Sequence, residues 1–147
     1  DDSHGIGAYG TTGRGTEEIC SSKVDVVVGT FGKAFGVNGG FVAASPTIIE
    51  AVRQKADTYI YTNPLSVADC AAAKKSVDIT DSQEGRTRLL HVQERIAQFR
   101  QGLKDMQLES IPGVHPVVPL MVRDTEKTRS FVQGFTDRGV LVAEWKN

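Results

Sequence analysis

The sequence predicts a fold of the α/β class. Residues 24–31 and 39–44 are short runs of β-branched and other apolar residues, which are typical of buried strands. A helix start signal follows the second run, and after about residue 81 apolar residues recur every three to four positions, which is the period of a helix. Because 147 residues are enough to enclose one hydrophobic core, we expect these elements to pack together.

Two helices are expected after the second strand. Ser45 can cap a helix, and Pro46 suits the first helical position, so a helix should run from there through about Ala56. The pair Asn63 and Pro64 repeats this start signal and should open a second helix with small residues along one face. Residues 59–62, between the two helices, are expected to be extended or a loop.

The pattern changes after residue 81 to a single long helix that resembles a connector between two lobes. Its apolar stripe is spaced by three and four residues and consists of Leu89, Val92, Ile96, Phe99, Leu103 and Met106. Beyond a turn at residues 111–113, we expect a strand at 117–122, a helix at 124–138 ended by Gly139, and a strand at 140–145. We therefore divide the chain into residues 1–80, a connector at 81–110, and a partial small domain at 111–147.

The composition excludes several classes of function. The net charge is −1, so the chain lacks the basic excess typical of nucleic-acid binding. No apolar run approaches the roughly 18 residues that a membrane span requires. The balanced charge favours a small-molecule partner. Cys20 and Cys70 have no metal-ligand spacing and suit a reducing compartment, so we expect a cytoplasmic protein. The polar start and the strand-like end suggest a fragment of a longer protein.

Glycine-rich stretches offer two motifs that we set aside. Residues 5–10 match the GxGxxG dinucleotide fingerprint, but no strand precedes them, and residues 11–15 after them do not favour the start of a helix. Residues 29–34 resemble a Walker A loop, yet the spacer is too short and Ala34 stands where a hydroxyl would bind magnesium. The glycines therefore need another explanation.

A third interpretation makes Lys33 a Schiff-base lysine. Walled by apolar residues and glycines at a strand end, its amine would be desolvated and could attack an aldehyde. Thr30 could offer its hydroxyl to a phosphate, Asp1 could hold a protonated pyridine nitrogen, and His4 could hydrogen-bond a phenolic oxygen. These are the requirements of pyridoxal phosphate. His91 and His115 are expected to be surface or packing residues.

Three stretches together resemble the α-oxoamine synthases, a family of fold type I pyridoxal-phosphate transferases. They are DDSHGIGAYGTTGRG at residues 1–15, VDVVVGTFGKAFGVNGG at 24–40 and YIYTNPL at 59–65. The resemblance implies the cofactor roles given above for Asp1, His4, Thr30 and Lys33, and it implies that Lys33 also moves the α-proton of the substrate. It further implies that Thr62 reaches the phosphate of a neighbouring subunit, and hence a homodimer. Arg14 is left open between a substrate contact and a structural residue.

The reaction that the resemblance implies is the condensation of an amino acid with an acyl-CoA to give an aminoketone and free CoA. Our main interpretation is glycine C-acetyltransferase, with 8-amino-7-oxononanoate synthase as the alternative. An aminotransferase and a truncated, non-catalytic module are the rivals. Family enzymes are more than twice as long as this chain, so we expect the chain alone to be an incomplete enzyme.

Overall fold

The computed structural model describes residues 1–145 and divides them into two compact units. The first unit comprises residues 1–97 together with Val114–Val117. The second comprises Gln98–Gly113 and the chain from Val118 onward. The division into three parts that the sequence predicts remains a prediction.

Both strands predicted for the first unit are confirmed. They form an antiparallel hairpin of β1 (Val26–Thr30) and β2 (Gly40–Ala44), with Val26 opposite Ala44 and Thr30 opposite Gly40. The loop between them is closed by a hydrogen bond from the Phe31 N–H to the Gly39 carbonyl at 2.9 Å. This hairpin positions the glycine-flanked lysine.

A short helix, α1 (Thr16–Cys20), follows the first glycine-rich stretch. Residues 11–15 are not helical, as expected, but the sequence analysis did not foresee the helix that begins at Thr16, because its cap comes from a residue distant in sequence. Gly15 offers no side chain to cap α1, but the Asp2 carboxylate accepts hydrogen bonds from the Thr16 N–H at 2.8 Å and from the Thr16 hydroxyl at 2.7 Å.

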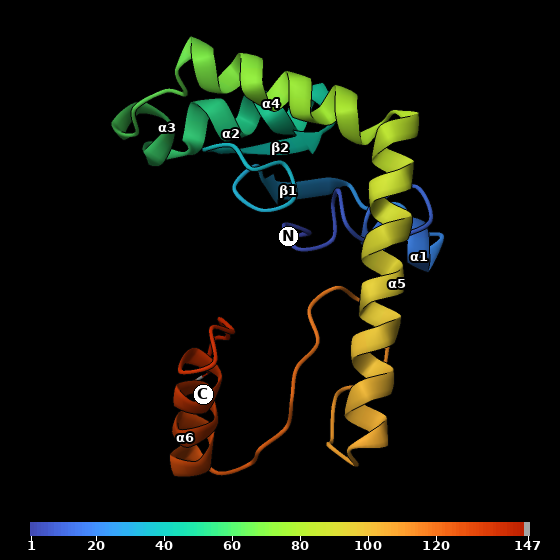
Figure 1. Cartoon of the computed structure of the whole chain (residues 1–147). Helices are drawn as coiled ribbons and strands as arrows, with labels where there is room; N and C mark the ends of the chain where they lie inside the picture. The colour runs from blue at the N-terminus through green and yellow to red at the C-terminus, as the bar shows by residue number, and fades with distance from the viewer. Residues whose placement is uncertain (146–147) are drawn as a thin grey trace. The chain divides into compact units, whose positions relative to one another are not determined.

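The predicted helix after β2 is confirmed as α2 (Pro46–Lys55), whose N-cap is Ser45. Residues 59–62 were expected to be extended or a loop, but most of them belong to a short helix, α3 (Asp57–Tyr61), whose first turn carries an acidic residue that suits the helix dipole. The next helix, α4 (Val67–Thr80), begins later than the Asn63 and Pro64 signal. Its start is set by a capping box between Ser66 and Asp69. In Figure 1, α2 lies next to β2, which it contacts.

The long helix predicted after residue 81 is confirmed as α5 (Gln83–Asp105), whereas its role as a connector remains a prediction. It leaves α4 through a tight corner, where a Cβ atom placed on Gly85 would lie 2.1 Å from the Thr80 carbonyl oxygen. The apolar stripe is only partly covered, since Leu89 and Leu103 are buried whereas Val92, Phe99 and Met106 are exposed.

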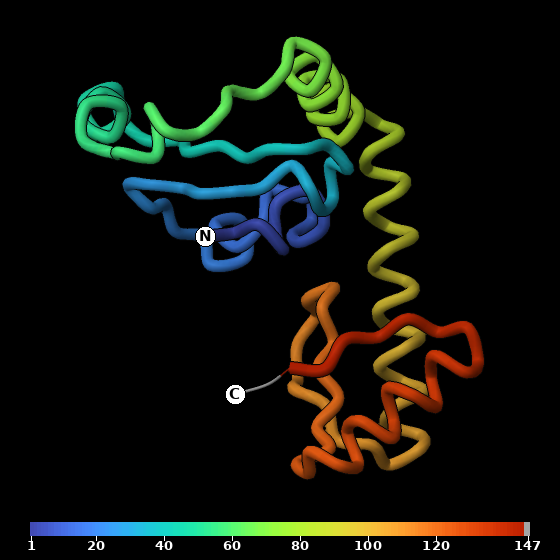
Figure 2. Tube along the Cα trace, turned by 90° about the vertical axis from the view of Figure 1, so that its left-hand side faces the viewer, coloured from blue at the N-terminus to red at the C-terminus, as the bar shows by residue number. Residues whose placement is uncertain are grey.

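In the second unit the predicted helix is confirmed as α6 (Thr125–Thr136), with the Asp124 carboxylate accepting from the Lys127 N–H at its N-cap. The strands predicted at 117–122 and 140–145 are wrong. The first contributes only an isolated bridge between Ser110 and Leu120, and residues 140–145 are irregular. A strand needs a neighbour for its backbone hydrogen bonds, and the described part of this unit offers no second strand. Figure 2 follows this course of the chain from α6 toward the C-terminus.

Candidate functional site

The lysine singled out in the sequence lies in the loop that follows β1. Lys33 Nζ donates a hydrogen bond to the Thr30 hydroxyl at 2.9 Å, so two of the predicted cofactor residues are in direct contact. The lysine side chain is nonetheless exposed. The apolar enclosure expected around it is therefore not supplied by residues 1–145.

Two further predicted residues, Asp1 and His4, share one turn at the N-terminus. The Asp1 carboxylate accepts from the Ser3 N–H at 2.9 Å, and the turn is closed by the Gly5 N–H, which donates to the Asp2 carbonyl at 2.9 Å. The Asp2 N–H donates in turn to the Val28 carbonyl at 2.8 Å. This bond attaches the turn to β1, and the N-terminal segment lies beside that strand in Figures 1 and 2.

The loop after His4 also contacts the loop that carries Lys33. Gly7 has a φ of 84°, and a Cβ atom placed on it would lie 2.8 Å from the Ala34 Cβ and 3.5 Å from the Phe35 Cζ. Only glycine allows both the positive φ and this close approach. The structure therefore brings the Asp1 and His4 turn and the Lys33 loop together at two points, β1 and Gly7.

Thr62 lies apart from this pair of segments. It follows α3, is exposed, and within residues 1–145 its side chain makes no hydrogen bond to the other predicted site residues. The same segment is attached to the Lys33 loop further along, because a Cβ atom on Gly39 would lie 2.4 Å from the Leu65 Cδ2. Its predicted role toward a neighbouring subunit remains a prediction.

Sequence reasoning missed the residue that organises the glycine-rich loop, Glu18. Its carboxylate accepts hydrogen bonds from the Thr12 N–H at 2.9 Å, from the Arg14 N–H at 3.1 Å and from the Thr11 hydroxyl. The Thr11 hydroxyl and these backbone donors lower the pKa of Glu18 from 4.5 to about 2. The sequence signal that could have identified Glu18 is an acidic residue placed shortly after a run of small polar residues and glycines, whose N–H groups it can bind.

Arg14 takes a structural position. Its guanidinium pairs with the Asp81 carboxylate at 3.0 Å, and both side chains are largely exposed. Asp81 is the C-cap of α4, so the ion pair joins the glycine-rich loop to the corner between α4 and α5. This position favours the structural role that the sequence left open.

The side chains present fit pyridoxal phosphate. The Thr30 hydroxyl at the end of β1 and the Lys33 amine in the loop that follows stand 2.9 Å apart, and a carboxylate and an imidazole stand on an adjoining turn. The amine, the hydroxyl, the carboxylate and the imidazole suit, in that order, the aldehyde, the phosphate, the pyridine nitrogen and the phenolic oxygen of the cofactor. Gly36, in the loop between Thr30 and Gly39, is exposed, and a Cβ atom placed on it would meet nothing within 4 Å.

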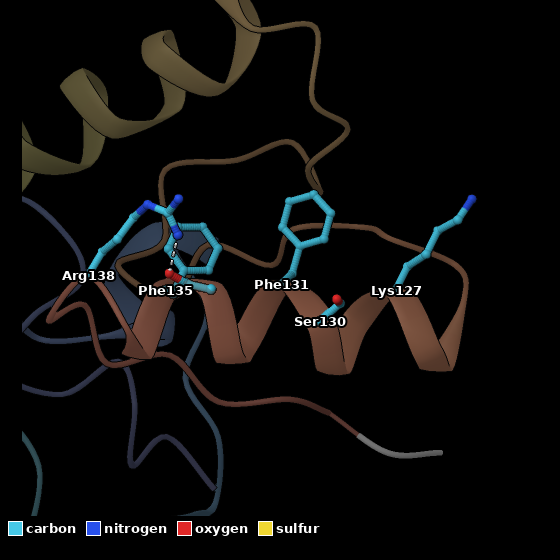
Figure 3. A pocket seen from close by; sticks show the side chains of 6 residues that line it. Lys127, Ser130, Phe131, Phe135 and Arg138 are labelled. Atoms are coloured by element: carbon cyan, nitrogen blue, oxygen red, sulfur yellow. Dashed lines mark hydrogen bonds between the residues drawn. The ribbon is translucent and has the colours of Figure 1, made fainter.

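A separate hollow of about 500 Å³ lies in the second unit, along α6. It is lined by Lys127, Ser130, Phe131, Gly134, Phe135 and Arg138. Figure 3 shows their side chains on one side of the helix, with Arg138 bonded back to the Gly134 carbonyl. None of the predicted site residues lines it. Across residues 1–145, no cluster of His, Cys, Asp and Glu could hold a metal ion, and no helix has the length and apolar character to cross a membrane.

Comparison with known proteins places these features in context. The family model described as aminotransferase class I and II matches residues 1–147. The chain is 39% identical over 145 residues to an 8-amino-7-oxononanoate synthase from Cellvibrio japonicus, and this match covers 97% of the chain and 36% of that protein. The chain thus spans little more than a third of the length of such relatives.

Solved structures resemble the chain over its whole length. The 8-amino-7-oxononanoate synthase of Francisella tularensis superposes with a TM-score of 0.87 at 22% identity, covering 100% of the chain and 44% of that structure. A serine palmitoyltransferase variant from S. paucimobilis with a bound PLP–myriocin adduct gives a TM-score of 0.87 at 28% identity, covering 98% and 38%. The first of these likenesses shows the fold alone.

Proposed function

We propose, on the premise that the chain belongs to the aminotransferase class I and II family, that the full-length protein is a pyridoxal-phosphate-dependent acyltransferase of the α-oxoamine synthase type. The family match and the relatives confirm the resemblance drawn from the sequence, the fold type I class, and the cofactor at the level of the family. The observation that carries the proposal is the contact between Lys33 and Thr30, next to the turn of Asp1 and His4.

Lys33 is the residue that would hold the cofactor covalently through Nζ. Bound pyridoxal phosphate supplies an electron sink that stabilises negative charge on the α-carbon of an amino acid. Once the amino acid has displaced it, Lys33 would move the α-proton, because it remains tethered beside that carbon. The Thr30 hydroxyl, which lies 2.9 Å from Nζ, would hydrogen-bond the phosphate of the cofactor.

Asp1 and His4 would hold the ring of the cofactor. The Asp1 carboxylate would keep the pyridine nitrogen protonated, and the His4 imidazole would hydrogen-bond the phenolic oxygen. The bond between the Ser3 N–H and Asp1 orients this carboxylate. Segments that the relatives possess and this chain does not span would complete the enclosure around the exposed Lys33.

Among the reactions of the family, we favour that of an 8-amino-7-oxononanoate synthase over glycine C-acetyltransferase. Curated relatives that bear the former name are 34% to 39% identical to this chain. The substrates would be an amino acid and an acyl-CoA, and the products an aminoketone and free CoA. The acyl chain would be longer than acetyl.

A cytoplasmic homodimer is part of the same proposal. Tyr59, Ile60 and Tyr61 on α3 are 61%, 78% and 85% exposed, and they immediately precede Thr62. An apolar surface of this kind at the predicted shared site suits contact with a second subunit.

The test is reduction of the cofactor-loaded, full-length protein with borohydride, followed by mapping of the adduct by mass spectrometry. We expect the adduct on Lys33 and its loss in Lys33→Ala. Lys23→Ala, at another exposed lysine of the same unit, is the matched control and should retain the adduct. An adduct on another residue would overturn the site assignment.

Free CoA release from a panel of amino acids and acyl-CoA donors tests the reaction. Release with longer acyl donors supports our choice within the family. Release only with glycine and acetyl-CoA would favour glycine C-acetyltransferase instead, and amino-group transfer without CoA release would favour an aminotransferase.

A further inference from the structure

We propose that His115 is a positioning residue for His4 and acts through the aromatic ring of Tyr9. The inference rests on the proposed function, because it concerns how His4 is presented to the cofactor. His115 lies far from the N-terminus in the sequence, and its pattern there indicated only a packing or surface role.

The first observation is an aromatic contact. The rings of Tyr9 and His115 have centroids 4.8 Å apart and planes inclined by 68°, which is an edge-to-face arrangement. Aromatic pairs of this geometry are attractive beyond the apolar area that they bury. Both side chains are half-buried, and both residues belong to the first unit.

The second observation is that the His115 ring is held in a fixed orientation. The Val117 N–H donates a hydrogen bond to His115 Nδ1 at 3.1 Å, which requires a lone pair on that nitrogen. The segment Val114–Val117 belongs to the first unit, although the residues on either side of it belong to the second. A short piece of chain therefore returns to the first unit and presents an oriented ring to Tyr9.

The third observation links Tyr9 to His4 through the backbone. The Tyr9 N–H donates to the Gly5 carbonyl at 2.8 Å, and the Tyr9 carbonyl accepts from the Gly15 N–H at 2.9 Å. Gly5 directly follows His4, and its own N–H closes the turn on the Asp2 carbonyl. A displacement of Tyr9 therefore pulls on the peptide next to His4.

Other contacts hold the part of the same loop that follows Tyr9. Gln93 on α5 donates through Nε2 to the Gly10 carbonyl at 3.1 Å, and the Glu18 carboxylate accepts from Thr11, Thr12 and Arg14. These contacts would remain if His115 were replaced. A variant that lacks the His115 ring should therefore keep the fold of the loop, while the segment between His4 and Tyr9 becomes more mobile.

The experiment uses the full-length protein and measures His4 directly. The imidazole resonance of His4 is followed by NMR in the cofactor-free protein, with a His4→Gln variant to assign it. The dissociation constant of pyridoxal phosphate is measured by absorbance titration, and the free energy of unfolding is measured for every variant. The variants are His115→Ala and His115→Phe, with His91→Ala, at an exposed histidine of α5, as the matched control.

We expect His115→Ala to shift or broaden the His4 resonance and to weaken cofactor binding about 3- to 10-fold, as loss of one aromatic pair implies. His115→Phe keeps an aromatic ring, so its changes in the His4 resonance and in cofactor affinity should be smaller than those of His115→Ala. His91→Ala should match the parent. A purely structural role would lower the unfolding free energy without moving the His4 resonance.

The proposal is overturned if the His4 resonance and the cofactor affinity in His115→Ala equal those of the parent. It is also overturned if they change no more than in His91→Ala. Should His115→Ala fail to fold, the same comparison between His115→Phe and the parent decides. Failure of the proposed function is a different result, namely the absence of any adduct on Lys33 in the parent.

Discussion

Substitution of Glu18 by glutamine tests how the glycine-rich loop is held. The glutamine side chain has nearly the same shape as glutamate, but one carboxylate oxygen is replaced by an NH₂ group. This group cannot accept a hydrogen bond from the donors that the carboxylate binds. These donors are the N–H groups of Thr12 and Arg14 and the hydroxyl of Thr11. The variant therefore leaves at least one donor without an acceptor.

The magnitude follows from the pKa of Glu18, which is lowered from 4.5 to about 2. If the whole shift became folding free energy, it would amount to about 3 kcal/mol. Because the carboxylate is accessible to solvent, water screens these interactions, and we expect about 1 kcal/mol at neutral pH.

The sign of the pH dependence is fixed by the direction of the shift. A folded-state pKa below the unfolded value means that the stabilisation is fully present above 4.5 and is lost as the pH falls toward 2. The difference in unfolding free energy between the parent and Glu18→Gln should thus shrink over this interval.

Urea unfolding of the full-length protein at a series of pH values, with the cofactor content held constant, measures this difference. Glu84→Gln is the control, since Glu84 pairs with Arg88 on the exposed surface of α5 and should contribute only about 0.3–0.5 kcal/mol. A difference for Glu18→Gln that is absent at neutral pH, or that stays constant as the pH falls from 4.5, would refute the reasoning.

Two further predictions concern helix stability. Gly85→Ala should lower the free energy of unfolding by about 2–3 kcal/mol, because its Cβ atom would lie 2.1 Å from the Thr80 carbonyl oxygen. Gly102→Ala, in the same helix, would place a Cβ atom that meets nothing within 4 Å, so it should raise the free energy of unfolding by about 0.5–1 kcal/mol. Equal effects of the two in thermal unfolding would contradict the close approach at the corner. Ser66→Ala should cost about 1 kcal/mol by removing the capping box of α4, measured against Ser22→Ala at an exposed position outside the helices. A loss no greater than that of Ser22→Ala would argue against the cap.

The elements that could be predicted are those whose hydrogen bonds are local. Ser45 and Pro46 predict the start of α2, and the apolar period predicts α5. Both predictions succeed because a helix makes its backbone hydrogen bonds within itself and begins at a recognisable cap. The short helix α1 escaped this reasoning, since its cap is the Asp2 carboxylate from a different part of the chain. The strands expected beyond residue 113 failed for a related reason, because a strand depends on a partner that its own sequence does not specify.

The same division applies to the candidate site. The order of Asp1, His4, Thr30 and Lys33 along the chain by itself predicted the chemistry, because each residue type would meet one demand of the proposed cofactor. Only the tertiary structure decided that the loop after His4 rests on Ala34 and that His115 meets Tyr9. Such contacts join segments distant in sequence, and packing between them is set by the shapes of both partners, which neither segment encodes alone.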